Sequence, residues 1–240
     1  IDRATPDFYS PAQGQTFEVV RAELEEKYYT GEGDLAQALD TMHRALTEAH
    51  AASLTPVALA PLEWQLGFLW YLNDPTRTSE AEVHLNRALP VYEAELLAGT
   101  LDDTEQPGYI QHTAMGLVLL ASITQEMALI ERMNYLAFLL DNTNPIKTEL
   151  FCAIVTSLLH HGKAEAARGY ASSAWQLYTQ NLSGRGTRAE TCLRDRLVRL
   201  DKKLGQAIVP RLPDSDLADD QPPVEPPTLT TEQYLLRQFA

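Results

Sequence analysis

The stretch LEWQLGFLWYLNDPTRTSEAEVHLNRAL, residues 62–89, decides the fold class of this chain. Aromatic and small residues recur in it at spacings of three and four, namely Trp64, Gly67, Trp70, Ala81, Leu85 and Ala88. Such spacings place side chains on one face of an α-helix. An Asn-Asp-Pro turn signal separates the two parts. The stretch therefore predicts two helices whose small residues let their backbones approach closely.

The second half of this stretch recurs along the chain. A further copy of the small–large–small pattern is Ala38, Met42 and Ala45, and the same spacing recurs in Ala167, Ala171 and Ala174, where the middle residue is also small. Ala38 and Ala81 are 43 residues apart, and Ala81 and Ala167 are 86 residues apart, which is twice that interval. A missing copy then belongs near Ala128. Four helix pairs at one period predict a helical solenoid. The alternative is a generic helical bundle in which the alanines coincide by chance.

At this point the chain resembles the tetratricopeptide-repeat (TPR) superfamily. The resemblance rests on Leu66-Gly67 followed by Trp70, on the Ala81 pattern, and on Met115-Gly116. It is strongest over residues 62–89 and weaker over 16–181, and the period here exceeds the family's usual ~34 residues. The resemblance implies an all-α, right-handed α-solenoid of about four TPR-like helix pairs. It also implies a concave groove, lined by the first helix of each pair, that holds peptides or helices.

Helix formers such as Ala, Leu, Glu and Gln dominate the chain, and period-two alternation is nearly absent. We predict helices over residues 16–29, 34–51, 57–72, 79–98, 108–124, 126–141, 146–161, 163–181 and 188–208. Pro90 should kink or split the fourth of these helices. Ser79-x-x-Glu82 and Thr187-x-x-Glu190 have the form of capping boxes at helix starts.

The chain divides into three predicted parts. Residues 1–15 form an extended arm with Phe8 and Tyr9 as aromatic anchors. Residues 16–208 form the TPR-like repeat domain, which ends in the capping helix 188–208. Residues 209–240 form a Pro-rich acidic strap and a short terminal helix, which should dock through Tyr234, Leu235 and Phe239 because a short helix on a tether is unstable alone.

Composition excludes several classes of protein. The 240 residues carry a formal net charge of −14, from 33 acidic against 19 basic residues, which disfavours binding to duplex DNA. No run of eighteen apolar residues exists, so we expect no transmembrane segment. Cys152 and Cys192 are expected to be free thiols, which favours a reducing soluble compartment. A first residue other than Met is compatible with a processed N-terminus, and hence with mitochondrial or periplasmic residence; the compartment stays open.

No pattern in the sequence predicts catalysis. The chain has six histidines but no HExxH motif, no Walker A loop and no GxSxG elbow. We interpret Glu80 and His84 as an ordinary surface pair four residues apart. We therefore expect no catalytic residue, no metal site and no cofactor. An alternative is a ligand-binding or metal-binding protein that uses dispersed residues, such as the histidines with Asp40, Glu80 or Glu126.

The sequence thus favours a non-catalytic protein–protein interaction scaffold or adaptor, an accessory subunit of a multiprotein complex. Its predicted contact residues are Phe8, Tyr9, Trp64, Gln65, Tyr71, His112, Lys147, Arg194, Arg196, Arg199, Tyr234, Leu235 and Phe239. The alternative is RNA or membrane-surface binding by the basic helix at 188–203. The favoured interpretation of that helix is a cap whose leucines pack inward, namely Leu193, Leu197, Leu200 and Leu204.

Overall fold

A computed structural model describes residues 15–30, 33–74 and 78–205. Within these ranges the regular elements are all helical and no strand occurs, which confirms the predicted all-α class. The chain divides into two units, residues 1–209 and 210–240. The second unit lies outside the described residues, and so do five predicted contact residues: Phe8, Tyr9, Tyr234, Leu235 and Phe239.

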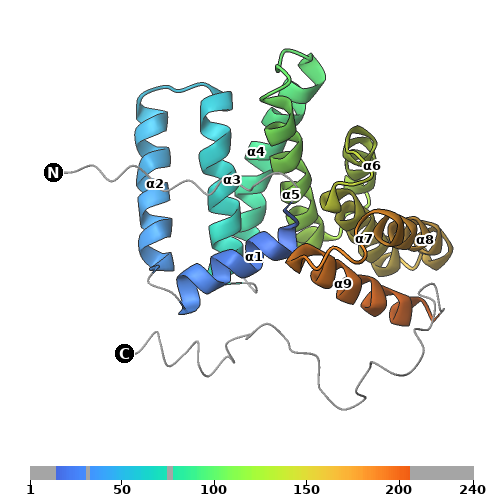
Figure 1. Cartoon of the computed structure of the whole chain (residues 1–240). Coiled ribbons are helices and arrows are strands. Elements are labelled where there is room, and N and C mark those ends of the chain that lie inside the picture. The colour runs from blue at the N-terminus through green and yellow to red at the C-terminus, as the bar shows by residue number, and fades with distance from the viewer. Residues whose placement is uncertain (1–14, 31–32, 75–77, 206–240) are drawn as a thin grey trace. The chain divides into compact units, whose positions relative to one another are not determined.

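Nine α-helices and one π-helical turn make up the described part (Figure 1). In chain order they are α1 (Phe17–Glu25), η1 (Glu26–Thr30), α2 (Leu35–Ala51), α3 (Pro56–Asn73), α4 (Thr78–Ala98), α5 (Gln106–Thr124), α6 (Leu129–Leu139), α7 (Pro145–His160), α8 (Ala164–Asn181) and α9 (Arg188–Leu204). Each predicted helix is confirmed, with ends that differ by a few residues. None of these helices is both long and apolar enough to cross a membrane, as the sequence predicts.

Local sequence explains most helix ends. Thr187 caps α9, because its side chain accepts a hydrogen bond from the N–H of Glu190, as the capping box predicts. The same helix ends at Leu204, earlier than predicted, because Gly205 adopts φ +62°. Ser79 does not cap α4; it lies inside that helix, which already begins at Thr78.

Pro90 neither splits nor ends α4, which runs through it from Thr78 to Ala98. A proline lacks only its own N–H and clashes mainly with the preceding turn. Packing along the whole length of α4 compensates for that loss, since Leu85, Ala88, Leu89 and Tyr92 around the proline are all buried. The predicted split of this helix at Pro90 is therefore wrong.

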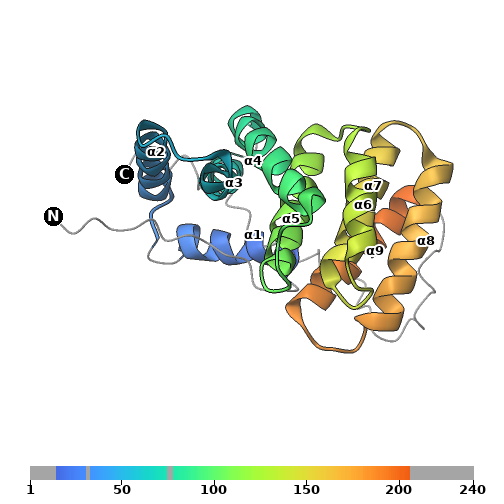
Figure 2. The ribbon, with the colours of Figure 1, turned by 90° about the horizontal axis from the view of Figure 1, so that it is seen from above.

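Neighbouring helices pack against each other in chain order (Figure 2). The helix α2 packs on α3, α3 on α4, and α4 on α5; α5 contacts both α6 and α7, and α7 contacts α8 and α9. The repeat pattern marks two of these contacts, because all three members are buried in the copies on α4 (from Ala81) and α8 (from Ala167). In the first copy only Met42 is buried, and both its alanines are half-buried.

The N-terminal helix departs from the predicted repeat. Residues 16–29 were expected to pair with 34–51 as the first helix pair. Instead, α1 lies across the ends of α3 and α5 and also contacts α9 (Figure 1). The apolar face of α1 packs on α3, where the ring of Phe17 contacts the rings of Phe68 and Tyr71. The first helix of the described chain therefore bridges elements that are far apart in sequence.

Candidate functional site

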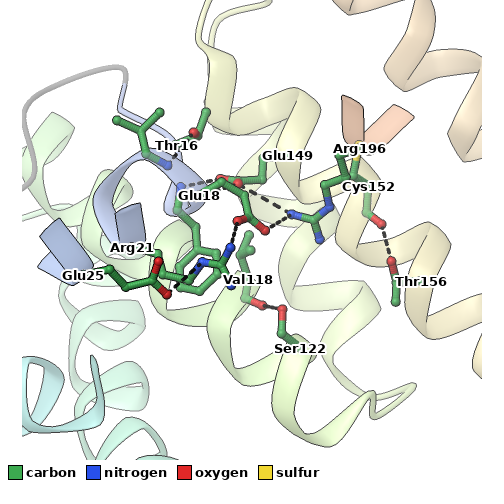
Figure 3. A network of polar contacts seen from close by, with 12 residues as sticks. Thr16, Glu18, Arg21, Glu25, Val118, Ser122, Glu149, Cys152, Thr156 and Arg196 are labelled. Carbon is green, nitrogen blue, oxygen red and sulfur yellow. Dashed lines mark hydrogen bonds and ion pairs between the residues drawn. The ribbon is translucent and has the colours of Figure 1, made fainter. Parts of the chain in front are cut away.

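A buried carboxylate stands where three helices meet. Glu149 of α7 is 0% exposed, and its carboxylate accepts hydrogen bonds from the main-chain N–H of Phe17 at 2.6 Å and of Glu18 at 3.2 Å. Arg196 of α9 lies 3.5 Å from the Glu149 carboxylate and 3.9 Å from that of Glu18 (Figure 3). One side chain of α7 thus binds the first turn of α1 and faces a guanidinium of α9.

Burial sets the charge state of this carboxylate. Loss of water raises the pKa of Glu149 to about 7. Arg196 opposes that rise, the neighbouring Glu18 adds to it, and the two main-chain N–H groups oppose it. The N-terminus of α1 carries a partial positive charge that also favours an anion here. The contact between α7 and α1 therefore involves a group that titrates near neutral pH.

The start of α1 is bound through main-chain atoms. Gln111 of α5 is buried and donates its side-chain amide to the carbonyl of Gln15 at 2.6 Å. Thr16 supplies the N-cap, because its hydroxyl accepts from the N–H of Val19 at 3.4 Å. Gln111 thus contacts a main-chain carbonyl of α1 before its N-cap, and Glu149 contacts two main-chain N–H groups after the N-cap. These three contacts depend on the backbone geometry of α1 rather than on its side chains.

Side chains of α1 supply the apolar half of the contact. Phe17, Val20 and Leu24 lie on one helix face and are buried. The Phe17 ring meets Phe68 edge-on with centroids 5.7 Å apart, and its centroid lies 6.1 Å from that of Tyr71. Full burial of three such side chains contributes several kcal/mol, at roughly 1.5–3 kcal/mol each. Polar and apolar contacts together hold a short helix in one place.

A second buried polar centre joins α2, α3 and α4. The Glu63 carboxylate lies 2.5 Å from Nδ1 of His84, and both side chains are buried. Arg87 approaches the other Glu63 oxygen at 3.5 Å. The ring of His43 lies 5.7 Å from that of His84, and Trp70 donates its indole N–H to Nε2 of His43 at 3.2 Å. The cluster ties three consecutive helices together.

The tautomer of His43 follows from that contact. Because Nε2 of His43 accepts a hydrogen bond from the indole N–H of Trp70, this nitrogen carries no proton of its own. Burial and the neighbouring His84 lower the pKa of His43, in agreement with a neutral ring. The predicted surface pair of His84 with Glu80 is wrong, since His84 turns inward to Glu63. Within the described ranges, no three His, Cys, Asp or Glu side chains are grouped so as to hold a metal ion.

The residues predicted to line a groove do not share one open surface. Trp64 and Gln65 are buried in the core. The indole of Trp64 stacks on Phe68 with centroids 4.2 Å apart and donates to the carbonyl of His112 at 2.9 Å. Trp64 and Gln65 therefore face the core and line no open surface of α3.

The other three predicted groove residues are half-buried. Tyr71 lies beside Phe17, within the contact of α1. The ring of His112 is close to Trp64, and Lys147 donates to the carbonyl of Leu140 and to Asn142, at 3.0 and 2.8 Å. Each of the three side chains is thus engaged within the fold.

The basic helix α9 is divided between the core and the solvent. Arg194 and Arg199 are exposed, whereas the Arg196 side chain is 11% exposed and faces Glu149. The four leucines predicted to pack inward from α9 are buried. Of the three arginines expected to bind a partner, the structure therefore presents two to solvent.

An exposed aromatic pair marks the outer face of α6. Phe138 is 84% exposed and Tyr135, three residues earlier, is 43% exposed. On one flank Arg132 binds Glu93 of α4 through two hydrogen bonds of 2.8 and 2.9 Å. On the other flank Asn134 donates to the hydroxyl of Tyr170 of α8 at 2.7 Å. The neighbouring helices hold α6 on both sides, so its aromatic face is presented on a fixed support.

Sequence reasoning missed Glu63, Gln111, Glu149 and the pair on α6. A signal was present for Glu149, because it precedes an otherwise apolar helical segment, ELFCAIV from Glu149 to Val155. A charged residue on a buried face needs a partner. The sequence did not reveal that partner, because Phe17 and Arg196 are distant from Glu149 along the chain. The pair on α6 has no distinguishing sequence pattern.

Comparisons with known proteins assign this chain to no family. No protein-family model matches it, and neither a curated protein nor a solved structure shows significant similarity to it.

Proposed function

We propose that this chain is a non-catalytic protein–protein interaction scaffold or adaptor, and an accessory subunit of a larger multiprotein complex. The observation that carries the proposal is the exposed aromatic face of α6, where Phe138 is 84% exposed. Single exposed aliphatic side chains are ordinary on protein surfaces. A nearly free phenylalanine beside a partly exposed tyrosine, on a helix fixed at both flanks, supplies aromatic residue types that are enriched at protein–protein interfaces.

Energetics favour burial of this face by a partner. Removal of one exposed phenylalanine side chain from water is worth roughly 1.5–3 kcal/mol. The Arg132–Glu93 and Asn134–Tyr170 contacts already fix the helix, so little ordering cost remains when a partner binds.

The proposal includes a right-handed, TPR-like solenoid arrangement. Its support is the buried repeat pattern on α4 and α8, together with the side-chain links from α4 to α6 and from α6 to α8.

Photocrosslinking tests this function. A photoreactive phenylalanine analogue replaces Phe138 in the full chain, and a matched chain carries it at Leu54, another exposed apolar residue, between α2 and α3. Both chains are expressed and irradiated in the source cells. We expect a discrete heterologous crosslink from position 138 that a Tyr135→Ser change reduces, and no such product from position 54. Equal, diffuse crosslinking from both positions would contradict the proposal.

A further inference from the structure

We infer that α1 can leave the surface on which it packs, and that an amphipathic helix of a partner protein binds there in its place. We call this surface the seat; it comprises Phe68 and Tyr71 of α3, Gln111 of α5, Glu149 of α7 and Arg196 of α9. This inference rests on the proposed scaffold function and names the chemistry of one partner. It concerns a surface separate from the aromatic face of α6.

The polar side of the seat recognises the start of a helix. Gln111 binds a carbonyl before the N-cap, and Glu149 binds two N–H groups in the first turn. Every α-helix presents free N–H groups at its start. These polar contacts by themselves therefore place no requirement on the side chains of the bound helix, only on its entry geometry.

The apolar side of the seat restricts which helices fit. In α1 the buried side chains occupy the first, third, fourth and eighth helical positions, namely Phe17, Val19, Val20 and Leu24. Arg196 lies within 3.9 Å of Glu18, at the second position. The seat therefore fits a helix with a Ser, Thr or Asp cap, an aromatic first residue, an acidic second residue and aliphatic residues at positions three, four and eight.

The seat is not fully satisfied by α1. Among the described residues, two buried polar atoms of the seat have no hydrogen-bond partner: Oε1 of Gln111 and one terminal guanidinium nitrogen of Arg196, which has only the ion-pair contacts at 3.5 Å and 3.9 Å. An unmade hydrogen bond of a buried group costs stability. At nine residues, α1 is also too short to be stable on its own and depends on this contact. A helix that satisfies those atoms would compete for the seat.

The main test uses the α1 peptide as probe. A fluorescent peptide of residues 15–30, QTFEVVRAELEEKYYT, is titrated against the full wild-type chain and the full Val20→Asp chain, with circular dichroism to verify folding. The aspartate opposes docking of the chain's own α1. We expect the Val20→Asp chain to bind the peptide at least about tenfold more tightly than wild type, where the tethered α1 competes at an effective concentration on the order of millimolar.

Two controls assign the binding to the seat. A peptide that carries Val20→Asp should not bind, and a Glu149→Ala change in the Val20→Asp chain should weaken peptide binding by about tenfold, since both N–H contacts lose their acceptor. Equal affinity of the wild-type and Val20→Asp chains would overturn the inference. So would a folded Val20→Asp chain that shows no saturable binding.

Hydrogen exchange of the wild-type chain tests the same inference if Val20→Asp fails to fold. An exchangeable α1 must open while the rest of the chain stays folded. We expect its amides to exchange at least about 100-fold faster than those of α5 and α7. Equal protection would overturn the inference, because α1 would then open only when the whole chain unfolds. Such a failure would leave the crosslinks from Phe138 unaffected, so the two proposals fail separately.

Discussion

Leu85 of α4 rests directly on Gly67 of α3. A Cβ placed at Gly67 would lie 2.8 Å from Cγ and 2.9 Å from Cδ2 of Leu85. These distances are shorter than normal carbon–carbon contacts. The glycine therefore sets how closely the two helices pack, and the middle residue of the small–large–small pattern fills the space that it leaves.

We predict that Gly67→Ala destabilises the chain by about 1–2 kcal/mol. Overpacking typically costs ~1–3 kcal/mol, and the better helix propensity of alanine offsets part of it. Gly169 of α8 is the matched control, because a Cβ there meets nothing within 4 Å. Gly169→Ala should stabilise by about 0.5–1 kcal/mol. Urea denaturation measures both variants, and equal effects would show that the helices do not pack at Gly67.

The two capping-box sequences should differ in their effect on stability. Thr187 caps α9, whereas Ser79 lies inside α4. We therefore expect Thr187→Ala to cost about 1 kcal/mol and Ser79→Ala to stay within about 0.5 kcal/mol of wild type. Thermal denaturation followed by circular dichroism compares the two. A larger loss from Ser79→Ala would mean that α4 begins later than Thr78.

The sequence revealed features that depend on near neighbours in the chain. Helix spans and the Thr187 cap follow from residues a few positions apart, and the close approach at Gly67 joins two helices that are consecutive in the chain. The placement of α1 did not follow, because its partners on α3, α5, α7 and α9 are distant in sequence and repeat periodicity favoured α2. Trp64 was predicted as a groove residue, yet α3 is covered on several faces, and no local pattern reports that covering.

Glu149 should make stability depend on pH. Its folded pKa of about 7 exceeds the ordinary carboxyl value of 4.5, so the folded chain binds the proton more tightly than the unfolded chain. The stabilisation from this group is complete below pH 4.5 and is lost as pH rises through about 7. Once both pKa values are passed, the loss amounts to about 3–4 kcal/mol, at ~1.4 kcal/mol per pKa unit.

Glu149→Gln isolates this effect from the other carboxyl groups. The amide cannot ionise, so the stability of the variant relative to wild type should rise by about 1–3 kcal/mol between pH 5 and pH 8. Urea denaturation of both chains across that range gives the difference. If the stability of the variant relative to wild type stayed constant or fell as pH rises, folding would not raise the pKa of Glu149.

His84 should be important for stability because it partners a buried carboxylate. In His84→Ala, Glu63 would lose its buried hydrogen-bond partner and keep the longer Arg87 contact at 3.5 Å, so we expect a loss of about 2–4 kcal/mol. Replacement of both His84 and Glu63 by leucine should recover at least half of that loss, since no buried charge remains unpaired. His50→Ala, at an exposed position, is the control and should change stability by less than about 0.5 kcal/mol.

The central claim is that this chain works as a subunit of a multiprotein complex. Native mass spectrometry of the tagged full chain, gently purified from its source, tests that claim most directly. We predict a discrete assembly of fixed stoichiometry that contains this chain and at least one other protein, and that a Phe138→Ser change weakens it. If the wild-type protein, purified under these conditions, gave only a species at the mass of the single 26.8 kDa chain, the claim would be contradicted.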